Sequence, residues 1–230
     1  MIYMVGDLHG DFCSNLLGNF RENMSKLFNS TFIQVGDFGL GFQSVINDVK
    51  ELREFNDFLE KNNNTMYVIR GNHDNPEFFN GKFTYSNLKL IPDYSVLNLE
   101  GKNFLCVGGG TSIDRLRRAP GISYWEDEKI KEITNEYPEI DVLVTHVPHR
   151  EVLGHDKPHD LLNHYMKMDI TLHAKIEREV AVLNGIFDSV KPRVWYSGHL
   201  HFSDTKEWNN CIHTILGIDE ISPVALSNKN

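Results

Sequence analysis

The chain has 230 residues and 40% hydrophobic content, enough to bury a core, and we expect a single domain over residues 1–230. Acidic residues outnumber basic ones by 32 to 23, and the net charge of −9 opposes binding to long nucleic acids, which needs clustered Lys and Arg. No stretch approaches the roughly 20 apolar residues of a membrane span. Residues 1–5 resemble a strand more than a signal peptide, and the three cysteines form no CxxC motif, so we expect a reduced, cytoplasmic setting.

The first third of the chain alternates between strand and helix patterns. Apolar runs predict strands at residues 1–5, 31–35 and 66–69. Apolar residues at helical spacing predict helices at residues 11–28 and 44–61. This alternation favours a mainly parallel sheet with right-handed crossovers.

The strict alternation of strands and helices ends in the rest of the chain. Residues 94–99 and 103–107 read as a hairpin, and residues 112–125 as an ordered loop. Further predicted elements are a short helix at 126–137, a strand at 141–145, an irregular region at 147–170, a helix at 172–190, and strands at 193–197, 205–208 and 212–216.

Five of the predicted strand ends carry polar side chains of metal-ligand type. Strand ends of open α/β folds meet at one edge, so these side chains should lie together. The five motifs are Gly6-Asp7-Leu8-His9, Gly36-Asp37-Phe38-Gly39, Arg70-Gly71-Asn72-His73-Asp74, Thr145-His146-Val147-Pro148 and Gly198-His199-Leu200-His201.

The side chains collected in this way are carboxylates, an amide and imidazoles, with no thiolate. Such donors suit manganese, iron or zinc. Seven ligands are too many for one ion, but two ions sharing a bridging carboxylate would use them all, and such sites activate water and clamp phosphoryl oxygens. Each motif alone is more often a turn, a helix cap or a half-buried histidine. Five such motifs at five strand ends are hard to explain by coincidence.

In this order the motifs read D-x-H, G-D, G-N-H-[DE], H and G-H-x-H, and the chain resembles the calcineurin-like metallophosphoesterases over residues 7–201. The loop at residues 112–125 is similar to one found in small bacterial and phage members. The resemblance implies an α/β fold in which two mixed β-sheets pack as a sandwich flanked by helices.

The resemblance also implies the roles of individual residues. One metal would be held by Asp7, His9, Asp37 and His201, and the other by Asp37, Asn72, His146 and His199. Two divalent ions are expected, manganese first, with iron, zinc or nickel as alternatives. A hydroxide bridging them would attack phosphorus in line. His73 would be the catalytic imidazole, and Asp74 would orient it.

Candidate substrate-binding residues are Arg70, which resembles an arginine of the family's protein phosphatases, and Arg115 and Arg118 in the loop at 112–125. Guanidinium groups bind phosphate bidentately, and Tyr124 and Trp125 in this loop could stack on a ring. The alternative is a surface loop with structural ion pairs and a core Trp125. The two interpretations are about equally favoured.

The leading functional prediction is hydrolysis of a small phosphate ester, with phosphomonoesters slightly favoured. The alternative within the class is a phosphodiesterase acting on a small or cyclic nucleotide. Residues 36–41 lack the arginine of the G-D-x-V-D-R-G motif, which disfavours a protein phosphatase. The negative charge and the lack of room for a capping domain disfavour a nuclease. A non-catalytic protein-binding scaffold is the alternative from another class, and the complete ligand set with His73 argues against it. The sequence does not indicate an oligomeric state.

Overall fold

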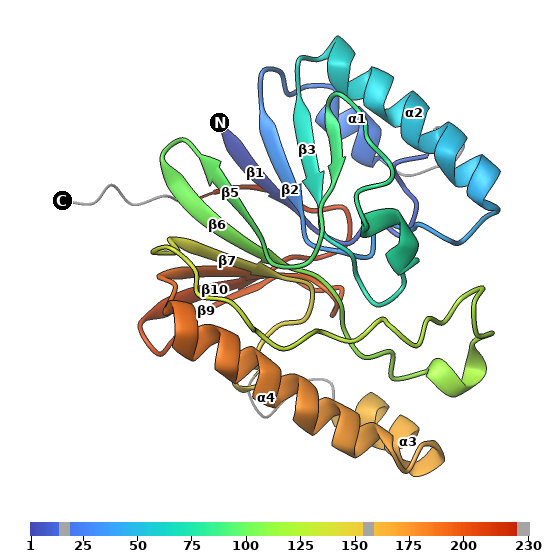
Figure 1. The fold of residues 1–230 in the computed structure, drawn as a ribbon, viewed down its shortest axis with the longest axis vertical. Helices are drawn as coiled ribbons and strands as arrows, with labels where there is room; N and C mark the ends of the chain where they lie inside the picture. The colour runs from blue at the N-terminus through green and yellow to red at the C-terminus, as the bar shows by residue number, and fades with distance from the viewer. Residues whose placement is uncertain (14–18, 154–158, 225–230) are drawn as a thin grey trace.

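Two β-sheets face each other in the computed structural model, which describes residues 1–13, 19–153 and 159–224 (Figure 1). The first sheet has five strands, in which β1 to β4 are parallel neighbours and β11 pairs antiparallel with β1. Its strands in spatial order are β11 (Ile221–Pro223), β1 (Ile2–Val5), β2 (Thr31–Gln34), β3 (Thr65–Val68) and β4 (Leu88–Leu90).

The second sheet has six strands and a parallel centre. β6, β7, β8 and β10 run parallel, while β5 and β9 pair antiparallel at the two edges. In spatial order its strands are β5 (Ser95–Leu99), β6 (Lys102–Val107), β7 (Val142–Thr145), β8 (Val194–Ser197), β10 (Cys211–Ile215) and β9 (Asp204–Trp208). Both sheets are therefore mixed, which confirms the predicted sandwich of two mixed sheets.

Alternate residues along the strands point into different layers of the core. In β2, Phe32 packs toward the helices of the first sheet, and Ile33 packs between the two sheets. In β7, Val144 lies between the sheets, while Leu143 packs in the layer that also contains Leu183 of the last helix. Strands buried on both faces carry continuous apolar runs, which is why these segments could be recognised in the sequence.

Helices cover the outer faces of the sandwich (Figure 1). The four α-helices of the described residues are α1 (Phe20–Met24), α2 (Val45–Lys61), α3 (His159–Met168) and α4 (Leu172–Val190). The same described residues contain three short 3₁₀ helices, η1 (Pro76–Phe79), η2 (Arg115–Arg117) and η3 (Arg150–Leu153). The Ser44 hydroxyl accepts a hydrogen bond from the Asn47 N–H and caps α2. No helix in these described ranges is long and apolar enough to cross a membrane.

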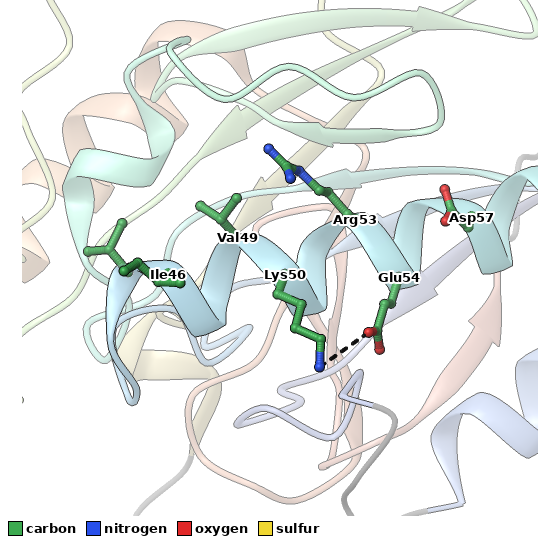
Figure 2. A pocket seen from close by; sticks show the side chains of 7 residues that line it. Ile46, Val49, Lys50, Arg53, Glu54 and Asp57 are labelled. Carbon is green, nitrogen blue, oxygen red and sulfur yellow. Dashed lines mark ion pairs between the residues drawn. The ribbon is translucent and has the colours of Figure 1, made fainter.

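A shallow groove lies on the surface of α2 (Figure 2). All of its lining residues belong to this one helix, and Lys50 and Glu54 form an ion pair of 3.6 Å in it. None of the predicted metal ligands lines the groove.

Several predicted elements differ from those observed. The helix predicted at 11–28 is reduced to α1 in the described residues, and 14–18 lie outside them. The irregular region at 147–170 contains α3, and the strands β4 and β11 were not predicted. These short elements carry too few apolar residues for a clear period.

The helix predicted at 126–137 is absent, because Arg70 engages its backbone. The buried Arg70 guanidinium donates to the carbonyls of Asp127, Glu128 and Lys129 at 2.7–3.1 Å. Its remaining donors bind Asp93, through Nε at 3.0 Å and Nη2 at 2.8 Å. All the N–H groups of Arg70 are thus used inside the protein, and its predicted substrate-binding role is corrected to a structural one.

We expect Arg70→Met to lower the free energy of unfolding by about 3–5 kcal/mol, because the substitution leaves the Asp93 carboxylate and three carbonyls without their donor. Urea denaturation followed by circular dichroism measures the change. Arg53→Met on the exposed face of α2 is the matched control, with an expected change within about 0.5 kcal/mol. Equal effects of the two substitutions would contradict this role for Arg70.

Candidate metal centre

The seven predicted metal ligands converge at the carboxyl ends of strands from both sheets. Their side chains form two clusters that share Asp37. The first cluster is Asp7, His9, Asp37 and His201, and the second is Asp37, His146 and His199, joined by Asn72. Within each of the two His/Asp groups, one ligand atom from every residue lies within 4.8 Å of the others.

In the first cluster, imidazole and carboxylate atoms face a common point. The Nε2 atoms of His9 and His201 are 2.8 Å apart, and His201 Nε2 lies 3.4 Å from Asp7 Oδ2. His9 Nε2 lies 3.8 Å from Asp37 Oδ2. Most of these spacings are near the separation of about 3 Å between neighbouring ligands that each lie about 2.1 Å from one ion.

The second cluster is more deeply buried. His146 Nε2 lies 2.9 Å from Asn72 Oδ1, 3.2 Å from His199 Nδ1 and 3.4 Å from Asp37 Oδ1. The other ring nitrogen of His146, Nδ1, donates to the Val35 carbonyl at 2.9 Å. This hydrogen bond leaves Nε2 directed at the cluster, as in metal-binding histidines.

The backbone around the ligands is strained, as is common at functional sites. His9, Asp37, His199 and His201 have positive φ values of 45°, 52°, 70° and 59°. Non-glycine residues rarely adopt this conformation. Four of the seven ligands therefore depend on the surrounding structure to hold them in place.

Two glycines allow the backbone to approach the acidic ligands. A Cβ at Gly71 would lie 2.0 Å from Asp37 Oδ1, and one at Gly198 would lie 2.1 Å from Asp7 Oδ1. No other residue type fits at either position without displacing the carboxylate.

The geometry of Asp37 fits a bridging ligand. Its Oδ1 accepts a hydrogen bond from the His73 backbone N–H at 2.9 Å, while its buried Oδ2 has no hydrogen-bond partner among the described residues. Burial raises the pKa of Asp37, but His146, His73 and His9 more than offset this and hold the pKa below its usual range. An ionised carboxylate with one unsatisfied oxygen, between two groups of imidazole, amide and carboxylate donors, is suited to divalent cations.

His73 lies at the edge of the two clusters without joining either. Its Nε2 is 3.8 Å from Asp37 Oδ2. Burial lowers the pKa of His73 to about 4, Arg118 adds to this effect, and Asp37 opposes it. The imidazole is therefore neutral near pH 7.

The predicted arginines of the 112–125 loop take different positions. Both terminal nitrogens of Arg118 contact the ring nitrogens of His73, and its Nε donates to Asp114 Oδ1 at 2.7 Å. Arg115 instead donates to Asp169 Oδ2 at 2.6 Å and to Thr171 Oγ1 at 2.7 Å. Arg118 thus borders the metal centre, whereas the predicted substrate role of Arg115 is corrected to an anchor between the loop and the start of α4.

Asp74 does not contact the His73 side chain as predicted. Its carboxylate accepts hydrogen bonds from the backbone N–H groups of Phe38, Gly39, Leu40 and Gly71, at 2.7–3.0 Å. The predicted catalytic role of Asp74 is therefore corrected. The residue fixes the loop after β2, which carries Asp37.

Phe42 is a neighbour of the site that the sequence did not reveal. Its side chain is 46% exposed, and its ring centre lies 6.3 Å from that of His9 and 6.4 Å from that of His73. A single apolar residue in a loop has no periodic signal. Tyr124, by contrast, is buried, and Trp125 is half-buried with its ring against Gly41.

The profile of the family described as calcineurin-like phosphoesterase matches residues 1–203, and the chain belongs to this family. No curated protein matches the chain. Among solved structures, one crystal structure has a TM-score of 0.57 at 12% identity, covering 94% of this chain and 90% of the other. This likeness shows the fold.

Two further solved structures are more distant. Phosphopantetheinyl hydrolase from Mycobacterium tuberculosis has a TM-score of 0.47 at 14% identity, covering 95% of this chain and 89% of that one. Vps29 complexed with zinc from Entamoeba histolytica has a TM-score of 0.39 at 12% identity, covering 94% and 73%.

We expect Asp37→Ala to abolish most metal binding at both clusters, because this is the one carboxylate that both share. The metal content per chain after incubation with Mn²⁺ and desalting, measured by mass spectrometry, tests this. Asp114→Ala is the control, since that carboxylate pairs with Arg118 and belongs to neither cluster. An Asp37→Ala variant that retained the wild-type stoichiometry would rule out a bridging Asp37.

Proposed function

We propose that this protein is a phosphoesterase with two divalent metal ions that hydrolyses a small phosphate ester, with monoesters favoured. The observation that carries the proposal is the pair of ligand clusters sharing Asp37, with the neutral imidazole of His73 beside them. Manganese is the metal that we propose to test first, and the cytoplasm is the proposed location.

The ions, when bound to the two clusters, would supply a hydroxide near neutral pH and neutralise charge on the phosphoryl oxygens. The chain supplies the remaining functions. Neutral His73 has an N–H that can donate a hydrogen bond to an oxygen of the transition state. Arg118, next to His73, offers a planar guanidinium that suits phosphate oxygens.

Monoesters are favoured because of the charge at the mouth of the site. A phosphomonoester carries up to two negative charges, and Arg118 adds a fixed positive charge beside the metal clusters. Phe42 favours the second candidate, a phosphodiesterase acting on a small or cyclic nucleotide. Its exposed ring near His9 and His73 would let a base stack there.

The non-catalytic scaffold, the alternative from another class, would require neither His73 nor all seven ligands. The deciding test is hydrolysis of p-nitrophenyl phosphate and bis-p-nitrophenyl phosphate with Mn²⁺, with metal content measured on the same sample. Turnover of either ester with about two metals per chain supports the proposal, and the preferred ester distinguishes monoesterase from diesterase. A protein that binds no metal and hydrolyses neither ester would favour the scaffold.

We expect His73→Ala to retain both metals and to lose roughly 10²–10³ in kcat, the usual contribution of one hydrogen-bond donor to the transition state. The same two esters provide the assay. His164→Ala is the control, because that residue lies on α3 and in neither ligand cluster. Native activity in His73→Ala would mean that another group performs this function.

We expect Arg118→Met to raise KM for the preferred ester roughly tenfold or more, since it removes a charge-assisted hydrogen bond to phosphate. Arg117→Met is the matched control, because Arg117 is exposed and lies over the Tyr165 ring, 5.5 Å from its centre. Steady-state kinetics with both variants gives the comparison. Similar kinetics for the two variants would remove Arg118 from the substrate site.

A further inference from the structure

A chain of buried hydrogen bonds leads from the second cluster to a carboxylate outside the family motifs. Asn72 Nδ2 donates to Ser112 Oγ at 2.9 Å, and Ser112 Oγ donates to Glu128 Oε2 at 2.6 Å. The Ser112 backbone N–H donates to Glu128 Oε1 at 2.9 Å. All three side chains are at most 3% exposed, so water does not compete for these bonds.

The direction of the hydrogen bonds determines which end of the Asn72 amide faces the metal centre. An ionised carboxylate only accepts hydrogen bonds, so the single hydroxyl hydrogen of Ser112 points to Glu128. Ser112 Oγ therefore has only lone pairs to offer Asn72. A rotated amide would place the Asn72 oxygen against them, so the amide nitrogen must face Ser112, and the amide oxygen must face His146 and the second cluster.

We propose that Glu128, acting through Ser112, is a positioning residue that aims the Asn72 oxygen at the ion of the second cluster. This inference rests on the proposed dinuclear metal centre and adds to it a residue that contacts no metal ligand directly. Partners of this kind typically change metal affinity by roughly 10–100-fold.

The backbone of Glu128 is held firmly enough for this task. Its carbonyl accepts hydrogen bonds from Arg70 Nη1 at 2.7 Å and from the Gly110 N–H at 2.9 Å. Its own N–H donates to the Trp125 carbonyl at 3.0 Å. Hydrogen bonds of both its carbonyl and its N–H therefore fix the backbone that carries the Glu128 carboxylate.

Glu179 on α4 provides a control glutamate that binds the residue next to Ser112. It is a buried glutamate that accepts hydrogen bonds from Thr111, the residue next to Ser112, but no hydrogen bond among the described residues connects it with Asn72. Burial raises the pKa of both glutamates to about 7, so at pH 8 both are mainly ionised. Glu179 interacts with His146 only through its charge, whereas Glu128 is hydrogen-bonded through Ser112 to Asn72.

The experiment is a calorimetric titration of the metal-free protein with Mn²⁺ at pH 8. Ser112→Ala and Glu128→Gln should each weaken binding of one ion by roughly 10–100-fold and leave the other ion unchanged. The affected ion should be the one lost in Asn72→Ala and retained in His9→Ala. The retained ion also shows that each variant is folded. Glu179→Gln removes a buried charge that interacts with His146 but no hydrogen bond to Ser112, so it should weaken metal binding less than Glu128→Gln does.

A double-mutant cycle tests whether the effect passes through Asn72. Ser112→Ala should cause no further loss of affinity in the Asn72→Ala background. Additive losses, equal losses in Glu128→Gln and Glu179→Gln, or wild-type affinity in Ser112→Ala would each overturn the proposal. Because the readout is metal affinity, an absence of ester hydrolysis would reject the proposed function while leaving this inference standing.

Discussion

The structure depends on the burial of an ionised carboxylate, Asp37, between two groups of ligands. A buried carboxylate is costly unless positive charge or hydrogen bonds compensate it. One oxygen of Asp37 accepts the His73 backbone N–H, and the other has no hydrogen-bond partner in the described part of the chain. The left-handed backbone at Asp37 and the absence of a Cβ at Gly71 both serve to place this carboxylate. The fold therefore buries a negative charge that hydrogen bonds compensate only in part, and a divalent cation would compensate the rest.

The acidic residues of the motifs divide into two kinds by what they face. Asp7 and Asp37 point into the clusters. Asp74 is as deeply buried, but four backbone N–H groups satisfy it. A carboxylate saturated by amides has little capacity left for a metal or for an imidazole. Asp74 therefore acts on chemistry only through the loop that it holds, which is the loop carrying Asp37.

The sequence was sufficient for features that depend on local pattern. Apolar periodicity located β2, β7 and α4 closely, and polar residues after strands identified the seven candidate ligands that converge. Features that depend on the path of distant segments were missed. The segment at 126–137 has a helical pattern, but Arg70 from another strand end captures its carbonyls. Likewise, nothing in the spacing of Arg115 and Arg118 indicates which one faces Asp169 and which one His73.

One continuous series of hydrogen bonds connects several of these missed features. Arg70 follows β3 in the same motif as Asn72, and its guanidinium holds the backbone that carries Glu128. Glu128 in turn binds Ser112, and Ser112 binds Asn72. The hydrogen bonds thus leave the motif at Arg70 and return to it at Asn72, two residues away. The sequence motif contains both Arg70 and Asn72, but it does not indicate the loop residues Ser112 and Glu128 that connect them. For this reason an arginine that looks like a phosphate ligand instead holds the backbone of Glu128, behind the candidate metal centre.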